Sequence, residues 1–563
     1  MDHKLELANA IGTQTGIPAA ELVDYIEIPP NPEMGDYAFP CFRLAKSLKK
    51  APAAIAAQLK DEVQLPGGIA RVEAAGGYLN FFANKDEYTK AVLDAVLSAD
   101  RYGATQQGEN KNVCIEFSSI NIAKPVHIGH LSSTAIGNSL CRIYGYLGYN
   151  TIAINHLGDW GTQFGKMIVA YQKWGSREMV EKESVRGLVK LYVRFHEEAE
   201  KDESLNDEAR AWFRKIELGD PDALELFNWF KEISLKEVMQ IYELLDVHFD
   251  SYAGESFFED KMKPIIDELG AKGLLKVDNG ATLVELEEYG MPPCIILRSD
   301  GATLYATRDL AAARYRKATY NFVKSLYVVA YQQNLHFQQF FKVLELLGDD
   351  WVKDMEHVNF GMVSMEEGTL STRHGNVVYL EDVLKAAIDK TLDIIKEKSP
   401  DLEDKQSAAR AVGVGAVVWG VLYNSRIKDI TFSWGKVLNF DGETGPYAQY
   451  THARCCSVLN KAGGYDANAV DYSKLDDPAV AALVKAIAVF PDAIQTAASK
   501  NEPYIVARAT IDICATFNRF YYDNRIMDDD AAIRNARLAI TDAARKVIAT
   551  GLYLVGLKAP ERM

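Results

Sequence analysis

A buried strand, a loop, a helix and a second strand follow one another in residues 113–159. The run VCIEF (113–117) is short, apolar and β-rich, which is typical of a strand covered on both faces. Residues 131–150 have helical spacing, and the run TIAINHLGD (151–159) indicates the second strand. Two parallel strands joined by a helix form a βαβ unit, so we expect an open parallel sheet. Ligands bind at the carboxyl edge of such sheets, in the loops that follow the strands.

The first 105 residues indicate a small α/β domain of their own. Helical spacing occurs in residues 1–16 and 53–63, and the run IARVEAAGGYLNFFAN (69–84) predicts two short strands around a Gly-Gly turn. A helix over residues 85–103 and a polar linker, QQGENK, then lead into the βαβ unit.

Beyond the βαβ unit the pattern extends the sheet and then becomes helical. Residues 325–332 and 359–364 look like a second set of parallel strands. An acidic helical insertion over 176–250 and a group of strands over 274–308 separate the two sets. We predict a multidomain protein, α/β followed by all-α, with domains at residues 1–107, 108–385 (with insertions at about 176–300) and 386–563.

The composition is that of a globular protein. Hydrophobic residues make up 48% and charged residues 25% of the 563, which excludes disordered, collagen-like and coiled-coil classes. No apolar run approaches the roughly 18–20 residues of a membrane span, and no secretory signal is visible. We therefore expect a cytoplasmic protein that does not associate with a membrane. The seven Cys form no C-x-x-C pair, which argues against a zinc ribbon; we predict no metal site.

The net charge of -16 argues against a general nucleic-acid coat protein. The acid is unevenly distributed, however. Residues 197–250 hold sixteen acidic against six basic residues, whereas residues 501–563 hold eight against nine. A partner that carries phosphates could therefore still meet a neutral or basic face.

The loop between the first strand and the helix contains His127-Ile128-Gly129-His130. The two imidazoles, three residues apart, share one face of the first helical turn, where the N–H groups favour an anion. Gly129 leaves room for a flat ring to approach the backbone. We therefore predict an ATP site. A chance occurrence and metal ligation are the alternatives, although no acidic or Cys partner stands at ligand spacing.

The wider string EFSSINIAKPVHIGHLSSTAIGN resembles the signature region of class I aminoacyl-tRNA synthetases, and specifically of arginyl-tRNA synthetases. Five further strings match that family in the expected order: INHLGDWGTQFGKM, LYATRDLAAARY, QQNLHFQQF, GMVSMEEGTLSTRHGNVVYLEDVL and GPYAQYTHAR. The resemblance covers essentially the whole chain. It implies a class I nucleotide-binding parallel sheet, a small N-terminal α/β domain that binds the tRNA elbow, and a C-terminal helical anticodon-binding domain.

The resemblance also implies the reaction. L-Arginine is activated by ATP, and its arginyl group passes to the 3′ end of tRNA(Arg), with release of AMP and pyrophosphate. Mg²⁺ is expected to accompany ATP instead of occupying a protein cage, and a monomer is expected. The string GDWGTQFG (158–165) is expected to border the active site, without an assigned role for Asp159, Trp160 or Gln163.

One departure from the class pattern concerns the mobile lysine loop, here TLSTRHG (369–375), in which both lysine positions are Thr. A lysine there would stabilise the charge that develops on the phosphates. The resemblance transfers this role to Lys124, for which an exposed loop lysine is the alternative, and Arg373 is the other available cation. The predicted catalytic residues are Lys124, His127, His130 and Arg373, and the predicted ATP-binding residues are His127, Gly129, His130, Gly361, Met362, Val363, Ser371, Thr372 and His374.

A pocket for arginine needs carboxylates that face its planar, permanently charged guanidinium. Glu116 is a candidate because a carboxylate in a buried strand requires a cationic partner; its alternative is a solvent-facing strand end. Tyr305 and Asp309 are four residues apart on one helix face, and the alternative for Asp309 is an ion pair with Arg308 or another neighbour. The resemblance assigns the guanidinium to Glu116, Tyr305 and Asp309, and the α-amino end to Asn121 and Gln333, with Ser119 and His130 nearby.

The predicted tRNA contacts are aromatic and basic residues in the first and last domains. Tyr78 and Asn80 alternate on one strand face, where they could read a D-loop base, and Tyr447, Tyr450, His452 and Arg454 combine rings with a cation that suits unstacked bases. Ordinary core packing is the alternative for each of them.

Two other functions remain open at this point. Another class I synthetase, for instance for cysteine, would be expected to show a zinc Cys/His set, which the sequence lacks. A non-catalytic tRNA-binding relative would be favoured if the signature histidines or the pocket carboxylates were missing, and they are present. The altered lysine loop is the only feature in favour of that relative.

Overall fold

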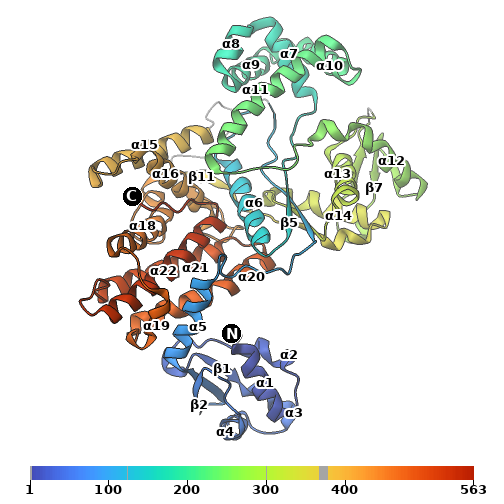
Figure 1. Cartoon of the computed structure of the whole chain (residues 1–563). Helices are drawn as coiled ribbons and strands as arrows, with labels where there is room; N and C mark the ends of the chain where they lie inside the picture. Colours follow the sequence, from blue (N-terminus) through green and yellow to red (C-terminus); the bar gives the residue numbers. More distant parts are fainter. Residues whose placement is uncertain (1–2, 123, 300, 367–377) are drawn as a thin grey trace. The chain divides into compact units, whose positions relative to one another are not determined.

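The structure is a computed structural model that describes residues 3–122, 124–299, 301–366 and 378–563 (Figure 1). The chain forms two compact units, each assembled from segments that are distant in sequence. The first unit consists of Met1–Tyr102, Cys455–Val489 and Ala515–Val547, and the second of Gly103–Arg454, Phe490–Cys514 and Ile548–Met563.

The N-terminal part of the first unit is a three-stranded antiparallel sheet in the order β1-β3-β2. Its β2–β3 hairpin is the predicted one, and Gly76 and Gly77 make the turn at φ of +58° and +93°, which side chains disfavour. The sequence did not indicate β1. Phe39 and Phe81 are fully buried in the core of this domain. The elements are α1 (His3–Thr15), α2 (Ala19–Leu22), β1 (Tyr37–Pro40), α3 (Ala45–Leu48), α4 (Pro52–Glu62), β2 (Ile69–Ala75), β3 (Tyr78–Ala83) and α5 (Lys85–Ser98).

Helices from the last part of the chain complete the first unit. The Lys546 ammonium donates to the carbonyl oxygen of Leu97 at the C-terminal end of α5, at 2.8 Å, where a positive charge complements the helix dipole. The Tyr472 hydroxyl donates to Asp94 of the same helix. The N-terminal domain and these C-terminal helices are therefore joined through α5.

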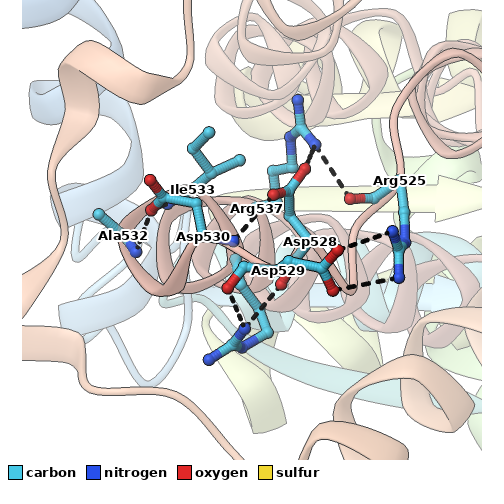
Figure 2. A network of polar contacts seen from close by, with 8 residues as sticks. Arg525, Asp528, Asp529, Asp530, Ala532, Ile533 and Arg537 are labelled. Carbon is cyan, nitrogen blue, oxygen red and sulfur yellow. Dashed lines mark hydrogen bonds and ion pairs between the residues drawn. The ribbon is translucent and has the colours of Figure 1, made fainter.

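Figure 2 shows the polar contacts that hold the turn between α21 (Tyr504–Asp523) and α22 (Ala531–Leu554). The carboxylate of Asp530 accepts hydrogen bonds from two N–H groups of the first turn of α22, at 2.8 and 3.1 Å. Ion pairs join Arg525 to Asp529 and Arg537 to Asp528. The cap satisfies backbone donors that the helix itself leaves free.

The second unit contains the predicted parallel sheet, with the strand order β10-β9-β4-β5. All three pairs of neighbours are parallel. The chain passes from β4 outward to β5 and then returns to β9 on the other side of β4, so the order reverses at β4 and opens a ligand site there. The elements are β4 (Asn112–Glu116), α6 (Gly129–Tyr146), β5 (Asn150–Ile154), β9 (Lys324–Tyr327), α14 (Asn334–Leu347) and β10 (Met355–His357).

The prediction of a sheet strand over residues 359–364 was wrong in position. The fourth strand of the sheet is β10, which ends at His357, and β11 (Val363–Met365) instead pairs in parallel with β12 (Ile430–Phe432). After His357 the chain makes one further bridge, between Phe360 and Ala330. From Gly361 onward its backbone bonds instead to residues 426–432, and the approach is so close that a Cβ at Gly361 would lie 2.4 Å from the carbonyl of Lys428.

Two insertions lie between β5 and β9 of the sheet. Figure 1 shows the helices of the first insertion gathered in one cluster, and the second insertion contains an antiparallel sheet in the order β6-β7-β8. Asp159 is fully buried; its carboxylate pairs with Lys231 and accepts hydrogen bonds from the backbone N–H and hydroxyl of Ser256 at 2.9 and 2.7 Å. Asp159, which precedes the first insertion, is thus bonded both to a helix of that insertion and to Ser256, which follows it. The elements are α7 (Thr162–Trp174), α8 (Arg177–Glu183), α9 (Val185–Ala199), α10 (Ser204–Glu217), α11 (Pro221–Leu245), α12 (Met262–Ala271), β6 (Leu275–Asp278), β7 (Ala281–Val284), β8 (Cys294–Leu297) and α13 (Tyr305–Tyr320).

Residues 378–563 are almost entirely helical, as predicted. One stretch, Pro478–Lys500, is long and apolar enough to cross a membrane by composition alone. The structure divides it at Val489 into two helices of eleven residues each, and each is shorter than the roughly 20 residues that a span requires. The remaining helices are α15 (Leu380–Lys398), α16 (Lys405–Leu422), α17 (Trp434–Val437), α18 (Gly445–Ala462), α19 (Pro478–Ala488) and α20 (Phe490–Lys500).

Candidate functional site

The loop after β4 has an unusual backbone that shapes the candidate site. Ser118 and Ser119 have φ of +66° and +42°, in the left-handed region that non-glycine residues seldom adopt. The Ser133 hydroxyl holds this loop, because it accepts from the Ser118 N–H at 2.9 Å and donates to the Val328 carbonyl at 2.7 Å. The loops after β4 and β9 are thereby joined at the edge where the sheet order reverses.

His127 and His130 lie together at the N-terminus of α6, with ring centroids 3.9 Å apart. The Nδ1 atom of His127 accepts from the Gly129 N–H, and the Nδ1 atom of His130 accepts from the His127 N–H, both at 3.1 Å. A nitrogen that accepts carries no proton, so each neutral ring holds its proton on Nε2. Burial, together with His127 and Lys124, lowers the pKa of His130 to about 3. The rings therefore offer neutral N–H donors, which suit phosphate oxygens.

Lys124 lies near these rings. Its side chain is exposed, and it makes no hydrogen bond or ion pair with any residue in the described part of the chain. Its charge nevertheless reaches both rings, since burial first and Lys124 second lower the pKa of His127. The position is compatible with a cation that acts beside the histidine pair.

Glu116, at the end of β4, already has a guanidinium partner within the chain. Its carboxylate forms an ion pair with Arg316 of α13, whose side chain is only 3% exposed. The other end of the Arg316 fork lies 3.3 Å from the Nδ1 atom of His156. Burial opposes the charge of Arg316, but the charge and hydrogen bond of Glu116, together with Tyr327 and Cys114, raise the pKa of Arg316 above its ordinary value. Glu116 is thus a partly buried carboxylate with a fixed orientation.

Asp309 and Tyr305 project from the start of α13, as the four-residue spacing predicts, and both contact His336 of α14. The His336 Nε2 atom lies 2.7 Å from the Asp309 carboxylate, and the rings of His336 and Tyr305 are 4.8 Å apart. Burial alone would raise the pKa of Asp309, but the hydrogen bond and charge of His336, together with the charges of His156 and Arg316, lower the pKa. Arg308, the alternative partner, pairs instead with Glu255 and Glu259.

Asn121 and Gln333 are exposed residues of the loops that follow β4 and β9. Asn121 is held by Gly158, because its strand-like segment pairs with Gly158 and its neighbour Ile122 donates to the Gly158 carbonyl at 3.1 Å. A Cβ at Gly158 would lie 2.2 Å from the Asn121 Oδ1 atom. Only glycine therefore permits this position of the Asn121 side chain.

Gly361, Met362 and Val363 use most of their backbone groups within the protein. The Gly361 N–H donates to the Arg426 carbonyl at 2.8 Å and the Met362 N–H donates to the Asp429 carboxylate at 2.7 Å, while Val363 pairs in β11. This geometry favours the structural interpretation of these three residues over an adenine contact. Ser371, Thr372, Arg373 and His374 lie outside the described residues.

The two predicted elbow contacts differ in exposure. Tyr78 is half-buried, with its ring edge-on to Phe42 at 5.4 Å, whereas Asn80 is 4% exposed in the central strand β3. The Asn80 Oδ1 atom is buried and has no hydrogen-bond partner among the residues that the structure describes. A buried carbonyl oxygen without a hydrogen bond lowers the stability of the fold, so the presence of Asn80 at this position requires an explanation.

The α18 residues also divide into two kinds. Tyr450 is 43% exposed and carries the Arg454 guanidinium 4.9 Å from its ring centroid, and Tyr447 is half-buried. His452 is only 3% exposed, and its Nδ1 atom lies 2.9 Å from the Pro560 carbonyl. The structure therefore favours the packing interpretation for His452, because no base can reach its ring.

Sequence reasoning missed three residues of the site: Arg316, His156 and His336. A signal existed for each. Arg316 lies seven residues, or two helical turns, after Asp309 on the same face of α13. His156 and His336 lie within the strings INHLGDWGTQFGKM and QQNLHFQQF, although a ring in such a string has no obvious partner until the fold is known.

Comparison with known proteins gives matches along the whole chain. Residues 92–434 match the family model described as tRNA synthetases class I (R), catalytic domain; residues 4–83 match the arginyl tRNA synthetase N terminal domain, and residues 448–563 the DALR anticodon binding domain. The arginine–tRNA ligases of Alkaliphilus metalliredigens (strain QYMF) and Clostridioides difficile (strain 630) are 54% and 53% identical, over 100% of each chain. The solved Thermus thermophilus arginyl-tRNA synthetase has a TM-score of 0.80 at 25% identity and covers 99% of both chains.

Proposed function

The chain belongs to the arginyl-tRNA synthetase family, and on that premise we propose how its residues divide the work of an arginine–tRNA ligase. The enzyme activates L-arginine with ATP to arginyl-adenylate and transfers the arginyl group to the 3′ end of tRNA(Arg). The division proposed here is supported by one observation: the charges of Glu116, at the end of β4, and of Asp309 both act on His156, while the loop after β4 leads to the neutral histidine pair.

The first step requires neither a general base nor a covalent nucleophile. A carboxylate oxygen of arginine attacks the α-phosphorus of ATP, and the bond to the pyrophosphate oxygen breaks. The Nε2–H groups of His127 and His130 donate hydrogen bonds to phosphate oxygens, and no proton is transferred. Lys124 supplies positive charge as pyrophosphate leaves. A Mg²⁺ ion that accompanies ATP would be held mainly by phosphate oxygens and water and would add positive charge at the phosphates.

Asp309 is the principal acceptor for the guanidinium in this proposal, and Tyr305 lies beside it. Only one oxygen of Asp309 is bonded to a described residue, and its side chain is 28% exposed. Glu116 is 12% exposed and its charge is already balanced by Arg316, so we assign it a smaller share of the guanidinium. Asn121 and Gln333 hold the α-amino end, with Ser119 and His130 beside them.

A glycine-to-alanine change tests the position of Asn121. Gly158→Ala should lower kcat/KM for arginine about 10²-fold, because the new methyl group displaces the Asn121 side chain and a misplacement of about 1 Å has this effect. Gly145→Ala is the matched control, since apart from its own helix backbone and chain neighbours no described atom lies within 4 Å of a Cβ there. Steady-state assays that give both variants normal kcat/KM would remove Asn121 from the arginine site.

The tRNA is held at two places in this proposal. Residues 1–107 bind the elbow through Tyr78 and Asn80, and residues 386–563 bind the anticodon, with Tyr447, Tyr450 and Arg454 at its surface. Tyr78 is half-buried and presents part of its ring to a base, whereas the Asn80 oxygen is buried, so Tyr78 is the principal contact of this pair. We also propose that the enzyme is cytoplasmic and that it is a monomer. Light scattering of the purified protein can test whether it is a monomer.

Substitution of the elbow residues should weaken tRNA binding alone. Tyr78→Ala should cost about 1–3 kcal/mol of tRNA(Arg) binding, the range for one stacked base. Asn80→Ala should weaken binding as well, and a thermal melt of this variant separates loss of binding from loss of packing, because Asn80 is only 4% exposed. Filter binding measures affinity, and the KM values for arginine and ATP serve as controls. If both variants bind tRNA(Arg) with the affinity of the parent enzyme, these two residues have a packing role and do not contact tRNA.

ATP–pyrophosphate exchange with each proteinogenic amino acid, with and without tRNA(Arg), tests the whole proposal. Only L-arginine is expected to support exchange, and tRNA(Arg) is expected to increase the rate. Exchange with a different amino acid would contradict the assigned pocket.

A further inference from the structure

His336 contacts two residues of the proposed arginine pocket and stands three residues after a third. Its Nε2 atom lies 2.7 Å from the Asp309 carboxylate, its ring packs edge-on against Tyr305 at 4.8 Å, and Gln333 ends the short 3-10 turn just before α14. The side chain is 11% exposed, so the contact is partly shielded from water. Shielding strengthens a hydrogen bond to a carboxylate.

The ring itself is held in place by aromatic neighbours. It stacks on Phe340, one helical turn further along α14, at 6.1 Å and an interplanar angle of 10°, and it contacts Phe337 at 5.3 Å. Phe337 and Phe340 are 6% and 1% exposed and belong to the core of this unit. A ring supported in this way has few alternative positions, so the direction of its N–H is set by the fold.

Asp309 has one oxygen bonded and one open. His336 engages Oδ2, and no residue within the described ranges hydrogen-bonds to Oδ1. Each carboxylate oxygen can accept two hydrogen bonds, so Oδ2 retains a site for the substrate. A guanidinium that binds with two parallel N–H groups needs both oxygens in one plane. A carboxylate that rotated freely would hold that plane only part of the time.

We propose that His336 is a positioning residue that fixes the plane of the Asp309 carboxylate for two-pronged binding of the arginine guanidinium. This inference rests on the proposed function of Asp309. His336 touches the carboxylate and not the substrate, and it acts through the orientation of Asp309. Because it aligns a binding group remote from the reacting atoms, it affects the affinity for arginine and leaves the chemistry of the phosphates unchanged.

Two variants separate the hydrogen bond from the aromatic packing. His336→Phe keeps the ring contacts with Tyr305 and Phe340 but removes the donor, whereas His336→Gln keeps an amide N–H near the Nε2 position and removes the ring. We expect His336→Phe to raise the arginine KM roughly 10- to 50-fold, the scale of one hydrogen bond to a charged group, with kcat and the ATP KM nearly unchanged. His336→Gln should remain within about threefold of the parent enzyme in arginine KM.

A role in packing alone would give the opposite order, with His336→Phe close to normal and His336→Gln impaired. That order, a normal arginine KM in His336→Phe, or a His336→Gln variant as impaired as His336→Phe, would each overturn the inference. The readout is arginine KM against kcat in ATP–pyrophosphate exchange with tRNA(Arg) present.

Asp309→Asn distinguishes this inference from the proposed function on which it rests. If Asp309→Asn leaves the arginine KM unchanged, Asp309 is not the acceptor and the proposed function of that residue fails. If Asp309→Asn raises the KM but His336→Phe does not, only the positioning role fails. If both hold, His336→Phe should add little in the Asp309→Asn background, because the group that it aligns has lost its charge.

Discussion

Lys124→Ala should lower kcat of arginyl-adenylate formation by about 10²–10³-fold, the scale for loss of one preorganised charge donor. The exposed ammonium has no partner in the described part of the protein, yet its charge lowers the pKa of both His127 and His130. It is therefore free to bind phosphates beside two neutral donors. The arginine KM should stay within a few-fold, because the cation acts mainly in the transition state. Pyrophosphate exchange measures both quantities.

The loop TLSTRHG provides the rescue experiment for Lys124. A lysine introduced as Thr372→Lys or His374→Lys into the Lys124→Ala background should recover part of the rate if the loop can take over the role. Lys124→Arg keeps the charge and should retain more activity than Lys124→Ala. Near-normal exchange in Lys124→Ala would refute the compensation by Lys124 and make Arg373 the leading candidate.

Asp309→Ala should raise the arginine KM by the equivalent of roughly 2–4 kcal/mol, because a charge-assisted pair of hydrogen bonds is lost in a partly shielded site. The carboxylate remains ionised at neutral pH, since His336, His156 and Arg316 together hold its pKa below the ordinary value against the effect of burial. The ATP KM should barely change, as the histidine pair is a separate part of the site.

The isosteric variant Asp309→Asn is the matched comparison, because it keeps the shape and one acceptor but removes the charge. Its arginine KM should lie between those of the parent enzyme and Asp309→Ala in steady-state aminoacylation. An unaltered arginine KM in Asp309→Ala would exclude the residue from the guanidinium site.

Local sequence patterns predicted the elements whose conformation depends on near neighbours. The β2–β3 hairpin follows from Gly76 and Gly77, which turn the chain at positive φ, and the βαβ unit follows from a change of period from a buried strand to a helix. The four-residue spacing of Tyr305 and Asp309 correctly put both on one helix face. The sequence did not indicate β10, because its three residues, Met355–His357, are too few to show the alternation of a strand.

The family strings and the candidate residues of the site could be read from the sequence because their identities and order are written along the chain. The partners of those residues could not be predicted from the sequence, because contacts between distant segments determine which groups meet. Arg316 reaches Glu116 across 200 positions, and His452 is covered by Pro560 across 108. A carboxylate that looked free for substrate, or a ring that looked free for a base, acquires its neighbour only when the sheet and helices pack. The sequence alone thus determined which chemical groups the site contains, and the tertiary structure decided which of them remain open to a ligand, because burial and hydrogen bonding are properties of the packed chain.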